Sequence, residues 1–411
     1  MQAIVVAAGR GTRMGPLTET RPKPLVPVAG ATLLEHVLDA AAGVVDEYVI
    51  VVGYRGDQIR ERIGASYAGT PVVYAEQDTQ EGTAHAVGCA EPHVEGPCLV
   101  LNGDVYVTSA LVEALAGADG TAMSVMPVAD PQSYGVVERG DDGRVTNVVE
   151  KPTDPPTDLA NLGLYRFTPR VFEYIDTVER SERGEYELTD ALARAIDRED
   201  GGVTAVSYDG PWLDVGRPWE LLAANSALLA EQEREINGTV ADGATLTGRV
   251  VVEDGARVRD GAYIEGPVVI QSGADVGPNA YVRGATVVGP DVRVGNAVEV
   301  KNSILMADTA VGHHAYVGDS VLGADVNFGA GTKVANLRHD DAPVQVQVNG
   351  ELVDTGRRKF GVVVGDDTKT GINTSLNAGV TLGTGTRTTL GAVVTTDKGR
   401  DHPSLVKRET A

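Results

Sequence analysis

The sequence predicts two architectures in succession: an α/β sheet covered by helices, and after it a parallel β-helix. Three observations support this. Residues 1 to about 215 alternate short β-branched runs with helical stretches, and apolar residues recur at every sixth position after Asn237. A Leu-, Ala- and Glu-rich stretch without Gly or Pro (219–236) lies between the two patterns. With 411 residues the chain is long enough for two domains.

The first half is predicted to form a mainly parallel sheet. Short β-branched runs at 4–7, 48–52 and 98–101 alternate with helical stretches at 32–42 and 59–63. Such alternation favours parallel pairing, and the ligands of these sheets bind beyond the carboxyl ends of the strands. The stretch at 219–236 is predicted to be a connecting helix, so the expected domains are 1–230 and 237–400.

The second half repeats a six-residue pattern that fits neither a helix nor a single strand. Its consecutive apolar positions are Val240, Leu246, Val252, Val258, Ile264, Ile270, Val276, Val282, Val288, Val294, Val300 and Met306. The pattern breaks near Val311 and resumes at Val364. It resembles the hexapeptide-repeat left-handed parallel β-helix, in which each hexad forms one short side of a coil.

Composition narrows the possible functions. The net charge of -23 disfavours nucleic acid as a partner, because its phosphates would be repelled. Arginine outnumbers lysine by 27 to 8, and this acidic, lysine-poor composition favours a halophile over an ordinary acidic mesophile. No apolar run reaches the ~18–20 residues that span a membrane. Two cysteines, Cys89 and Cys98, are predicted to be structural thiols in a reducing cytoplasm.

A glycine-rich loop, Gly9-Arg10-Gly11-Thr12-Arg13-Met14, directly follows the first predicted strand. Glycines let backbone N–H groups approach phosphates, and Arg13 can neutralise the oxygens of a leaving pyrophosphate. The loop lacks the Gly-Lys-Ser/Thr ending of a P-loop and the G-x-x-G tail of a dinucleotide fingerprint. Alone it indicates a phosphate site without identifying the ligand.

Further motifs follow this loop in a fixed order. They are Arg21-Pro22-Lys23-Pro24-Leu25, Gln77, Gly82-Thr83, Gly103-Asp104, Tyr134-Gly135, Glu150-Lys151-Pro152, Asn161 and Trp212-Leu213-Asp214-Val215-Gly216. Together they resemble the sugar-1-phosphate nucleotidylyltransferases, with a Rossmann-like nucleotidyltransferase domain, over roughly residues 1–230. Such a reaction needs no strong base, because the attacking phosphate is already anionic and catalysis consists of positioning and charge neutralisation.

The resemblance implies a role for each motif. Nucleobase and ribose contacts would come from Ala7, Ala8, Gly9, Gly11, Gln77, Gly82 and Thr83, phosphate contacts from Arg13 and Lys23, a Mg²⁺ site from Asp104 and Asp214, and sugar-phosphate contacts from Gly135, Glu150, Lys151 and Asn161. Two hard oxygen ligands suit Mg²⁺, which keeps several waters. Asp104 taken alone also fits a solvated turn.

Polar residues interrupt the hexads where a plain scaffold would not need them. They are Arg283, Glu299, Lys301, His313, Tyr316, Asn327 and Asn336. The series resembles the acetyltransferase half of the bifunctional N-acetylglucosamine-1-phosphate uridylyltransferases, from about residue 280 to 335 and again from 359 to 394. No Cys or carboxylate stands at a metal-binding spacing from His313 and His314, which disfavours a metal there.

This second resemblance implies acetyl transfer from acetyl-CoA to glucosamine 1-phosphate and uridylyl transfer from UTP, in a homotrimer. An imidazole can accept the proton that the attacking amine loses, so His313 would be the base and Glu299 would orient it. The remaining roles would be sugar-phosphate binding for Arg283, Lys301, Tyr316 and Asn327, and acetyl-CoA contacts for Ala330, the 372–392 coils and Asn336, the last also steadying the oxyanion.

Departures from the family pattern leave alternatives open. Leu337 follows Asn336 where the family has an aromatic residue, and an insertion at 339–358, predicted to form a hairpin, precedes Lys359 and leaves that residue's role as a phosphate ligand open. A nucleotidylyltransferase that uses the coil only for oligomerisation is the main alternative, and a non-catalytic assembly subunit is the second. The donor (UTP or dTTP) and the amino sugar are open as well.

Overall fold

The computed structural model describes residues 1–182, 184–199 and 201–399, and the chain divides into two compact units. The first unit comprises Met1–Arg10, Pro22–Leu25 and Leu33–Asp214, and the second comprises Gly11–Arg21, Val26–Thr32 and the chain from Val215 onward. Two short segments of the N-terminal half therefore belong to the second unit. The limits of the functional domains stay a prediction, and the last predicted residue, 400, lies outside the described residues.

A ten-stranded sheet forms the centre of the first unit. Its strands, in spatial order, are β10 (Gly135–Arg139), β11 (Arg144–Glu150), β13 (Val203–Ser207), β9 (Thr121–Pro127), β12 (Leu159–Phe167), β7 (Cys98–Asn102), β1 (Gln2–Val6), β4 (Glu47–Val52), β6 (Thr70–Glu76) and β5 (Ser66–Tyr67). Strands β7, β1, β4 and β6 pair in parallel, whereas β12 runs antiparallel to both β7 and β9. The sheet is therefore mixed, and the prediction of a mainly parallel sheet holds for the run β7-β1-β4-β6 and for the pair β13 and β9.

Helices cover both faces of this sheet. They are α1 (Leu33–Ala41), α2 (Gly56–Ile63), α3 (Thr83–Gly88), α4 (Ser109–Ala116), α5 (Arg170–Ile175) and α6 (Leu188–Arg198). Neighbouring residues of β1 serve different cores: Val5 packs with α1, α2 and α4, while Ile4 packs with α3, α5 and α6. This alternation follows from the two-residue period of a strand, so apolar residues on both faces predict a buried central strand.

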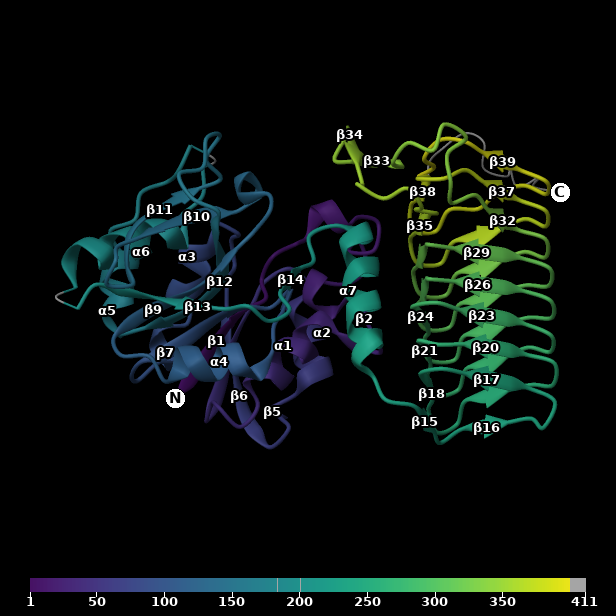
Figure 1. The fold of residues 1–411 in the computed structure, drawn as a ribbon, viewed down its shortest axis with the longest axis horizontal. Coiled ribbons are helices and arrows are strands. Elements are labelled where there is room, and N and C mark those ends of the chain that lie inside the picture. The colour runs from purple at the N-terminus through teal and green to yellow at the C-terminus, as the bar shows by residue number, and fades with distance from the viewer. Residues whose placement is uncertain (183, 200, 400–411) are drawn as a thin grey trace. The chain divides into compact units, whose positions relative to one another are not determined.

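The second unit contains a parallel β-helix whose coils contribute one short strand to each of three sheets (Figure 1). The β15 sheet holds β15 (Glu235–Ile236), β18 (Val250–Val252), β21 (Val268–Ile270), β24 (Thr286–Val288), β27 (Ile304–Leu305), β30 (Val321–Leu322), β35 (Val363–Val364) and β38 (Thr381–Leu382). The β16 sheet holds β16 (Thr239–Val240), β19 (Arg257–Val258), β22 (Asp275–Val276), β25 (Arg293–Val294), β28 (Ala310–Val311), β31 (Asn327–Phe328) and β36 (Lys369–Thr370). The β17 sheet holds β17 (Thr245–Thr247), β20 (Tyr263–Glu265), β23 (Tyr281–Arg283), β26 (Glu299–Lys301), β29 (Tyr316–Gly318), β32 (Lys333–Val334), β37 (Ser375–Leu376) and β39 (Val393–Val394).

The six-residue period is explained by the interior of the coils. Val282, Val300 and Val317 stack in register and are fully buried, so each hexad sends one apolar side chain into a common core. The register changes earlier than predicted. Val288 pairs with Leu305, and Met306 is therefore not the next member of the series. The period is shortened between Val300 and Leu305, before Val311.

The connecting helix and the insertion are both present. Helix α7 (Pro218–Glu231) ends before the predicted limit of 236, because residues 235 and 236 form β15. The insertion forms the predicted hairpin, in which β33 (Gln345–Val348) pairs antiparallel with β34 (Glu351–Asp354). Among the residues described, no helix combines the length and apolar character needed to cross a membrane.

Candidate active sites

The predicted nucleotide residues Ala7, Ala8 and Gly9 directly follow β1. The N–H of Ala7 still donates to Val51 O of β4 at 2.9 Å. The chain leaves the sheet after this residue. A methyl group added at Gly9 would meet no atom within 4 Å. Packing within the protein therefore does not require glycine at position 9, and its exposed backbone is available to a phosphate or ribose group.

Gln77 and Gly82 lie together, as the prediction of a shared role requires. Gln77 is buried, and its Nε2 donates to Gly82 O at 3.2 Å. Gly82 has φ +119°, and a Cβ there would collide with the backbone of Tyr186. The Thr83 hydroxyl oxygen accepts the N–H of Leu188 at 3.0 Å, so this side chain also holds the start of α6.

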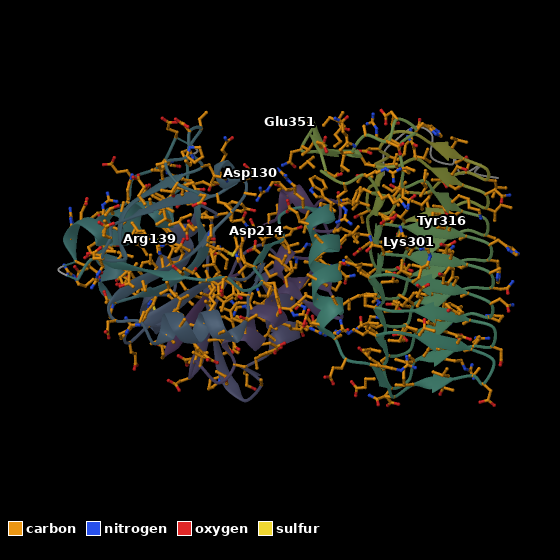
Figure 2. All side chains as sticks on the ribbon, in the orientation of Figure 1. Asp130, Arg139, Asp214, Lys301, Tyr316 and Glu351 are labelled. Carbon is orange, nitrogen blue, oxygen red and sulfur yellow. The ribbon has the colours of Figure 1, made fainter. Side chains whose placement is uncertain are left out.

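The two predicted metal ligands are brought together by a short strand pair. β8 (Val105–Tyr106) runs antiparallel to β14 (Leu213–Asp214), and Asp214 stands opposite Val105, next to Asp104 (Figure 2 labels Asp214). Lys23, which is 8% exposed, has its Nζ 2.5 Å from Asp104 Oδ2. The two aspartates thus stand at neighbouring backbone positions, and Mg²⁺ is held by one or two carboxylates together with waters and substrate phosphates. Over the described ranges, no cluster of three or more His, Cys, Asp or Glu suggests a site for another metal.

Gly11 and Arg13 belong to the second unit. Gly11 takes a left-handed conformation (φ 67°) at the start of a 3₁₀ turn, Thr12–Met14, and its carbonyl accepts the Thr18 hydroxyl at 2.9 Å. Arg13 is exposed, and its Nη2 lies 3.5 Å from the position that a Cβ on Gly216 would occupy. The guanidinium is therefore close to the backbone of Gly216, where the absence of a side chain leaves it room.

The predicted sugar-phosphate residues of the first unit meet at the ends of paired strands. Gly135 pairs with Glu150, and a methyl group at Gly135 would lie 3.1 Å from Glu150 Oε2 and 3.5 Å from Asn161 Cβ. Lys151 Nζ is 3.9 Å from Glu150 Oε1. Asn161 Nδ2 donates to the Tyr165 hydroxyl at 2.7 Å, and burial raises the pKa of Tyr165, so this hydroxyl stays protonated. The structure thus assembles all four residues.

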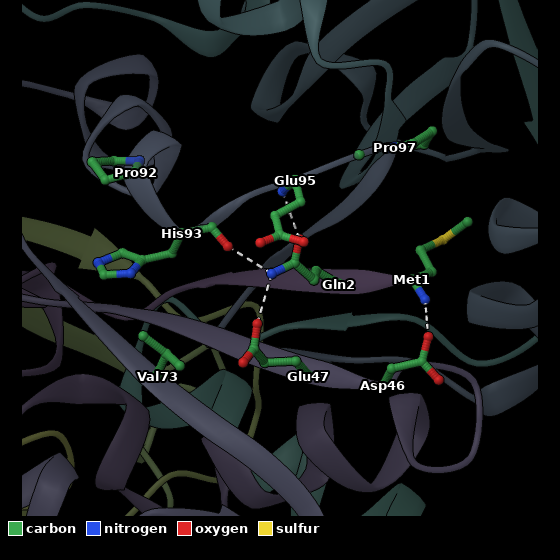
Figure 3. Close-up of a pocket in the computed structure, with 10 residues that line it drawn as sticks. Met1, Gln2, Asp46, Glu47, Val73, Pro92, His93, Glu95 and Pro97 are labelled. Carbon is green, nitrogen blue, oxygen red and sulfur yellow. Dashed lines mark hydrogen bonds and ion pairs between the residues drawn. The ribbon is translucent and has the colours of Figure 1, made fainter.

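A separate hollow of about 720 Å³ lies at the amino ends of β1 and β4 (Figure 3). Gln2 spans it, since its Nε2 donates to Glu47 Oε2 and to His93 O, both at 2.6 Å, and its Oε1 accepts the N–H of Glu95. No predicted site residue lines this hollow. It lies at the end of the strands opposite Gly9.

The two cysteines behave as structural thiols. Burial raises the pKa of Cys98 to about 12, and burial together with the charge of Asp78 raises the pKa of Cys89. Because the thiolate is the reactive form, neither side chain is a nucleophile near neutral pH.

Four predicted acetyltransferase residues share the outward face of the β17 sheet. Arg283 pairs with Lys301, Glu299 pairs with Tyr316, and Lys301 pairs with Gly318 on β26 and β29 (Figure 2 labels Lys301 and Tyr316). Alternate residues of a strand point to the same side, so their side chains form one polar surface. Burial, followed by the negative charge of Glu299, raises the pKa of Tyr316.

His313 lies at a corner of the β-helix, in the turn from β28 to β29, and is exposed. Its carbonyl accepts the N–H of Gly331 at 2.8 Å, so Ala330 occupies the equivalent corner of the next coil. The predicted base and this predicted acetyl-CoA contact are therefore neighbours. Asn327 lies on β31 of the β16 sheet, on the other side of this corner from Tyr316.

Glu299 does not orient His313 in this structure. Its Oε1 accepts two hydrogen bonds from Arg283, from Nε at 3.1 Å and from Nη2 at 2.9 Å. Within the described part of the chain, no hydrogen bond joins Glu299 to His313. The guanidinium on the neighbouring coil binds the carboxylate here, and the role of Glu299 in orienting His313 stays a prediction.

Asn336 is engaged on both hydrogens of its amide. Nδ2 lies 2.5 Å from Asp319 Oδ2 and 3.2 Å from the Tyr316 hydroxyl oxygen. An amide nitrogen carries only two hydrogens, so both are used in this structure, and the role of Asn336 toward the oxyanion stays a prediction. After the hairpin the chain returns to the neighbourhood of Asn336, since Lys359 pairs with Leu337, the residue that follows Asn336. Asp319 was missed from the sequence, although it lies where the hexad spacing is shortened.

Comparison with known proteins identifies the family. The nucleotidyl transferase family model matches residues 2–231. The "Bifunctional protein GlmU" of Methanococcus vannielii is 41% identical, and the match covers 100% of this chain and 98% of the relative. The chain belongs to the bifunctional GlmU family. A relative from Sulfurisphaera tokodaii, a "bifunctional sugar-1-phosphate nucleotidylyltransferase/acetyltransferase", is 36% identical over 97% of this chain and 98% of its own length.

Two further matches cover single parts of this GlmU-family chain. The GMPPB C-terminal domain model matches residues 264–384, which lie within the β-helix. A glucose-1-phosphate thymidylyltransferase of Bacillus anthracis has a solved structure with a TM-score of 0.51 and 28% identity, covering 56% of this chain and 95% of that one. The enzyme classes predicted for both halves, nucleotidyltransferase and acetyltransferase, agree with the GlmU family.

Proposed function

We propose that the chain makes UDP-N-acetylglucosamine in two reactions, acetyl transfer on a left-handed β-helix and uridylyl transfer in the N-terminal domain. What carries the proposal is that two separate sets of polar side chains are each assembled. One set is Asp104, which directly precedes β8, with Asp214 on β14, and the other is the polar face of the β17 sheet. Similarity over the full chain to bifunctional relatives supports the combination.

In the first reaction the amine of glucosamine 1-phosphate attacks the thioester carbonyl carbon of acetyl-CoA. A C–N bond forms, the C–S bond breaks, and CoA leaves as the thiol. His313 would accept the proton that the amine loses, since imidazole can act as a base near neutral pH. Lys301, Arg283, Tyr316 and Asn327 would bind the sugar phosphate. Exposure of His313 is compatible with two large substrates meeting at one corner of the coil.

In the second reaction an oxygen of N-acetylglucosamine 1-phosphate attacks the α-phosphorus of UTP, and pyrophosphate leaves. Asp104 and Asp214 would hold Mg²⁺, which supplies charge neutralisation on the phosphates when bound. Lys23 and Arg13 would neutralise the leaving group. The ion pair between Lys23 and Asp104 supports this role. Glu150, Lys151, Gly135 and Asn161 would hold the sugar phosphate.

The proposal includes a cytoplasmic homotrimer with UTP and acetyl-CoA as co-substrates. The test consists of two assays on the purified full chain in high salt with Mg²⁺. One assay measures pyrophosphate release from UTP and N-acetylglucosamine 1-phosphate, and the other measures thiol release from acetyl-CoA and glucosamine 1-phosphate. Repeating the first with dTTP, and the second with galactosamine 1-phosphate, identifies the preferred substrates.

Matched variants assign the sites. His313→Asn should abolish thiol release and leave pyrophosphate release intact, whereas His314→Asn, at the next and equally exposed position, should change neither. Asp104→Asn should abolish only pyrophosphate release, with Asp119→Asn as an exposed control. Wild-type protein without thiol release would favour the alternative of a nucleotidylyltransferase that uses its coil for oligomerisation.

A further inference from the structure

One corner of the β-helix changes composition where the predicted acetyltransferase residues begin. Three positions after the start of each β17-sheet strand, successive coils carry Gly248, Gly266, Gly284, Asn302, Asp319 and Asn336. Asn302 (φ 46°) and Asp319 (φ 52°) have left-handed backbones, which glycine adopts most easily. Gly248 and Gly284 have the same left-handed backbone, so glycine would serve this turn, and the Asn and Asp side chains need another explanation.

Asp319 is the centre of a hydrogen-bonded group that crosses three coils. It is 3% exposed, its Oδ1 accepts from Asn302 Nδ2 at 2.7 Å, and its Oδ2 accepts from Lys301 Nζ at 3.2 Å and from Asn336 Nδ2 at 2.5 Å. Burying a carboxylate is costly unless donors compensate it. Here three donors do so, and they come from the coil before Asp319 and the coil after it.

The neighbouring Gly318 provides the space that this group needs. A Cβ at Gly318 would lie 2.5 Å from the Tyr316 hydroxyl oxygen and 2.8 Å from Asn336 Nδ2. Without that carbon, the amide that binds Asp319 can also donate to Tyr316. Asp319 is thereby linked directly to Lys301 and, through Asn336, to Tyr316, two of the residues proposed to bind the sugar phosphate.

We infer that Asp319 is a positioning residue of the acetyltransferase site, which fixes Lys301 directly, and Tyr316 through Asn336, for binding of the amino-sugar phosphate. The inference rests on the proposed acetyl transfer. An ammonium has three N–H donors, and Asp319 uses one of them, so the others stay available to a phosphate. Asp319 itself is buried and does not contact the substrate.

A charge argument alone gives the opposite expectation. Removing a carboxylate next to Lys301 would increase the net positive charge near the phosphate and tighten substrate binding. Positioning instead requires that binding weaken, because a released Lys301 side chain regains its rotamer freedom. The direction of the change in KM therefore distinguishes the two roles.

The test is Asp319→Asn in the full chain, since asparagine already occupies this corner at Asn302. The KM for glucosamine 1-phosphate should rise roughly tenfold or more, while kcat falls less, as expected for lost substrate binding. Pyrophosphate release by the same preparation should stay at the wild-type value. Asp325→Asn is the matched control, because Asp325 has the same φ of 52° but its side chain is 63% exposed.

A double variant separates positioning from general stabilisation of the coil. If Asp319 acts through Lys301, Asp319→Asn should cost much less kcat/KM in a Lys301→Ala background than in the wild type. Additive losses, or a KM that is unchanged or lower in a folded Asp319→Asn protein, would overturn the inference. If the Asp319→Asn protein no longer unfolds cooperatively, Asp319→Gly replaces it in the same assays. Glycine is the residue at this corner in the first three coils, and the same criteria apply. Wild-type protein that releases no thiol would instead overturn the proposed acetyl transfer before any variant is made.

Discussion

Replacing Gly318 with alanine adds one methyl group at a crowded point of the proposed acetyltransferase site. The new Cβ would lie 2.5 Å from the Tyr316 hydroxyl oxygen, whereas ordinary van der Waals contact begins at 3.4 Å. The backbone at Gly318 does not have positive φ, so alanine brings no conformational strain of its own. The Tyr316 ring must therefore move by about 1 Å, a displacement that can cost about 10²-fold in rate.

The size of this effect distinguishes function from folding. Loss of the neutral hydrogen bond between Asn336 and Tyr316 should lower the free energy of unfolding by about 1 kcal/mol, too little to unfold the coil. A loss of about 10²-fold in kcat/KM equals about 2.7 kcal/mol of transition-state stabilisation. We therefore expect Gly318→Ala to lose acetyl transfer while remaining folded.

Both activities of one preparation provide the assay. Thiol release should fall about 10²-fold, while pyrophosphate release stays at the wild-type value. Gly399→Ala is the control, since a methyl group there meets no atom within 4 Å. Thiol release within about threefold of wild type would refute the reasoning, because the Tyr316 position would then not limit the reaction. An equal fall in both activities would also refute it, since it would indicate a general defect.

Three further predictions concern the metal, a strained glycine and an ion pair. Chelation by EDTA should abolish pyrophosphate release and leave thiol release unchanged, and Mg²⁺ should restore the former; loss of both would contradict a metal confined to Asp104 and Asp214. Gly82→Ala should lower the melting temperature and pyrophosphate release but not thiol release, because φ +119° costs a non-glycine residue about 1–3 kcal/mol; an unchanged melting temperature would exclude strain at this position. Arg259 holds the pKa of Asp275 below its ordinary value of 3.8. The ion pair therefore stabilises the folded protein above about pH 4, and this stabilisation is lost as the pH falls through the lower pKa that Asp275 has in the folded state. Arg259→Gln should thus lower the urea midpoint at pH 6 and have a smaller effect at pH 3, and an equal effect at both would argue against the charge pair.

Elements set by hydrophobic periodicity were predictable, and element limits were less so. The hexad pattern predicted a coil with inward apolar residues, and Val282, Val300 and Val317 stack accordingly. The predicted position of the period break was wrong, because Leu305 and Met306 are both apolar and the pattern alone does not distinguish them. The antiparallel strand β12 was not predicted, since its pairing depends on contacts distant in sequence.

The residues of the nucleotidyltransferase site were predictable where motifs that follow one another along the chain stand at the ends of successive strands. Asp104 and Asp214 are predicted to share a metal ion, and the pairing of β8 with β14 sets Asp214 opposite Val105, the residue after Asp104, while the metal role itself stays a prediction. The contact between Glu299 and Arg283 was not predictable, because Arg283 lies one coil away. Only the stacking register of the coils shows that Arg283 is nearer to Glu299 than His313 is. Asp319 was not predictable as a site residue, because a single Asp in a turn is common. Only the shortened hexad spacing around it distinguishes this position.

The stacking of equivalent coils makes the position of any added coil matter. Lys301, Asp319 and Asn336 come from three consecutive turns of the chain, separated only by the strand spacing of about 4.8 Å. An extra turn spliced in ahead of β23 would lengthen the protein and carry this trio along unchanged. The same turn spliced between β26 and β29 would draw Lys301 out of reach of Asp319 by one full spacing. The length of the β-helix is therefore fixed between β26 and β32, where these three side chains bind one another across neighbouring turns.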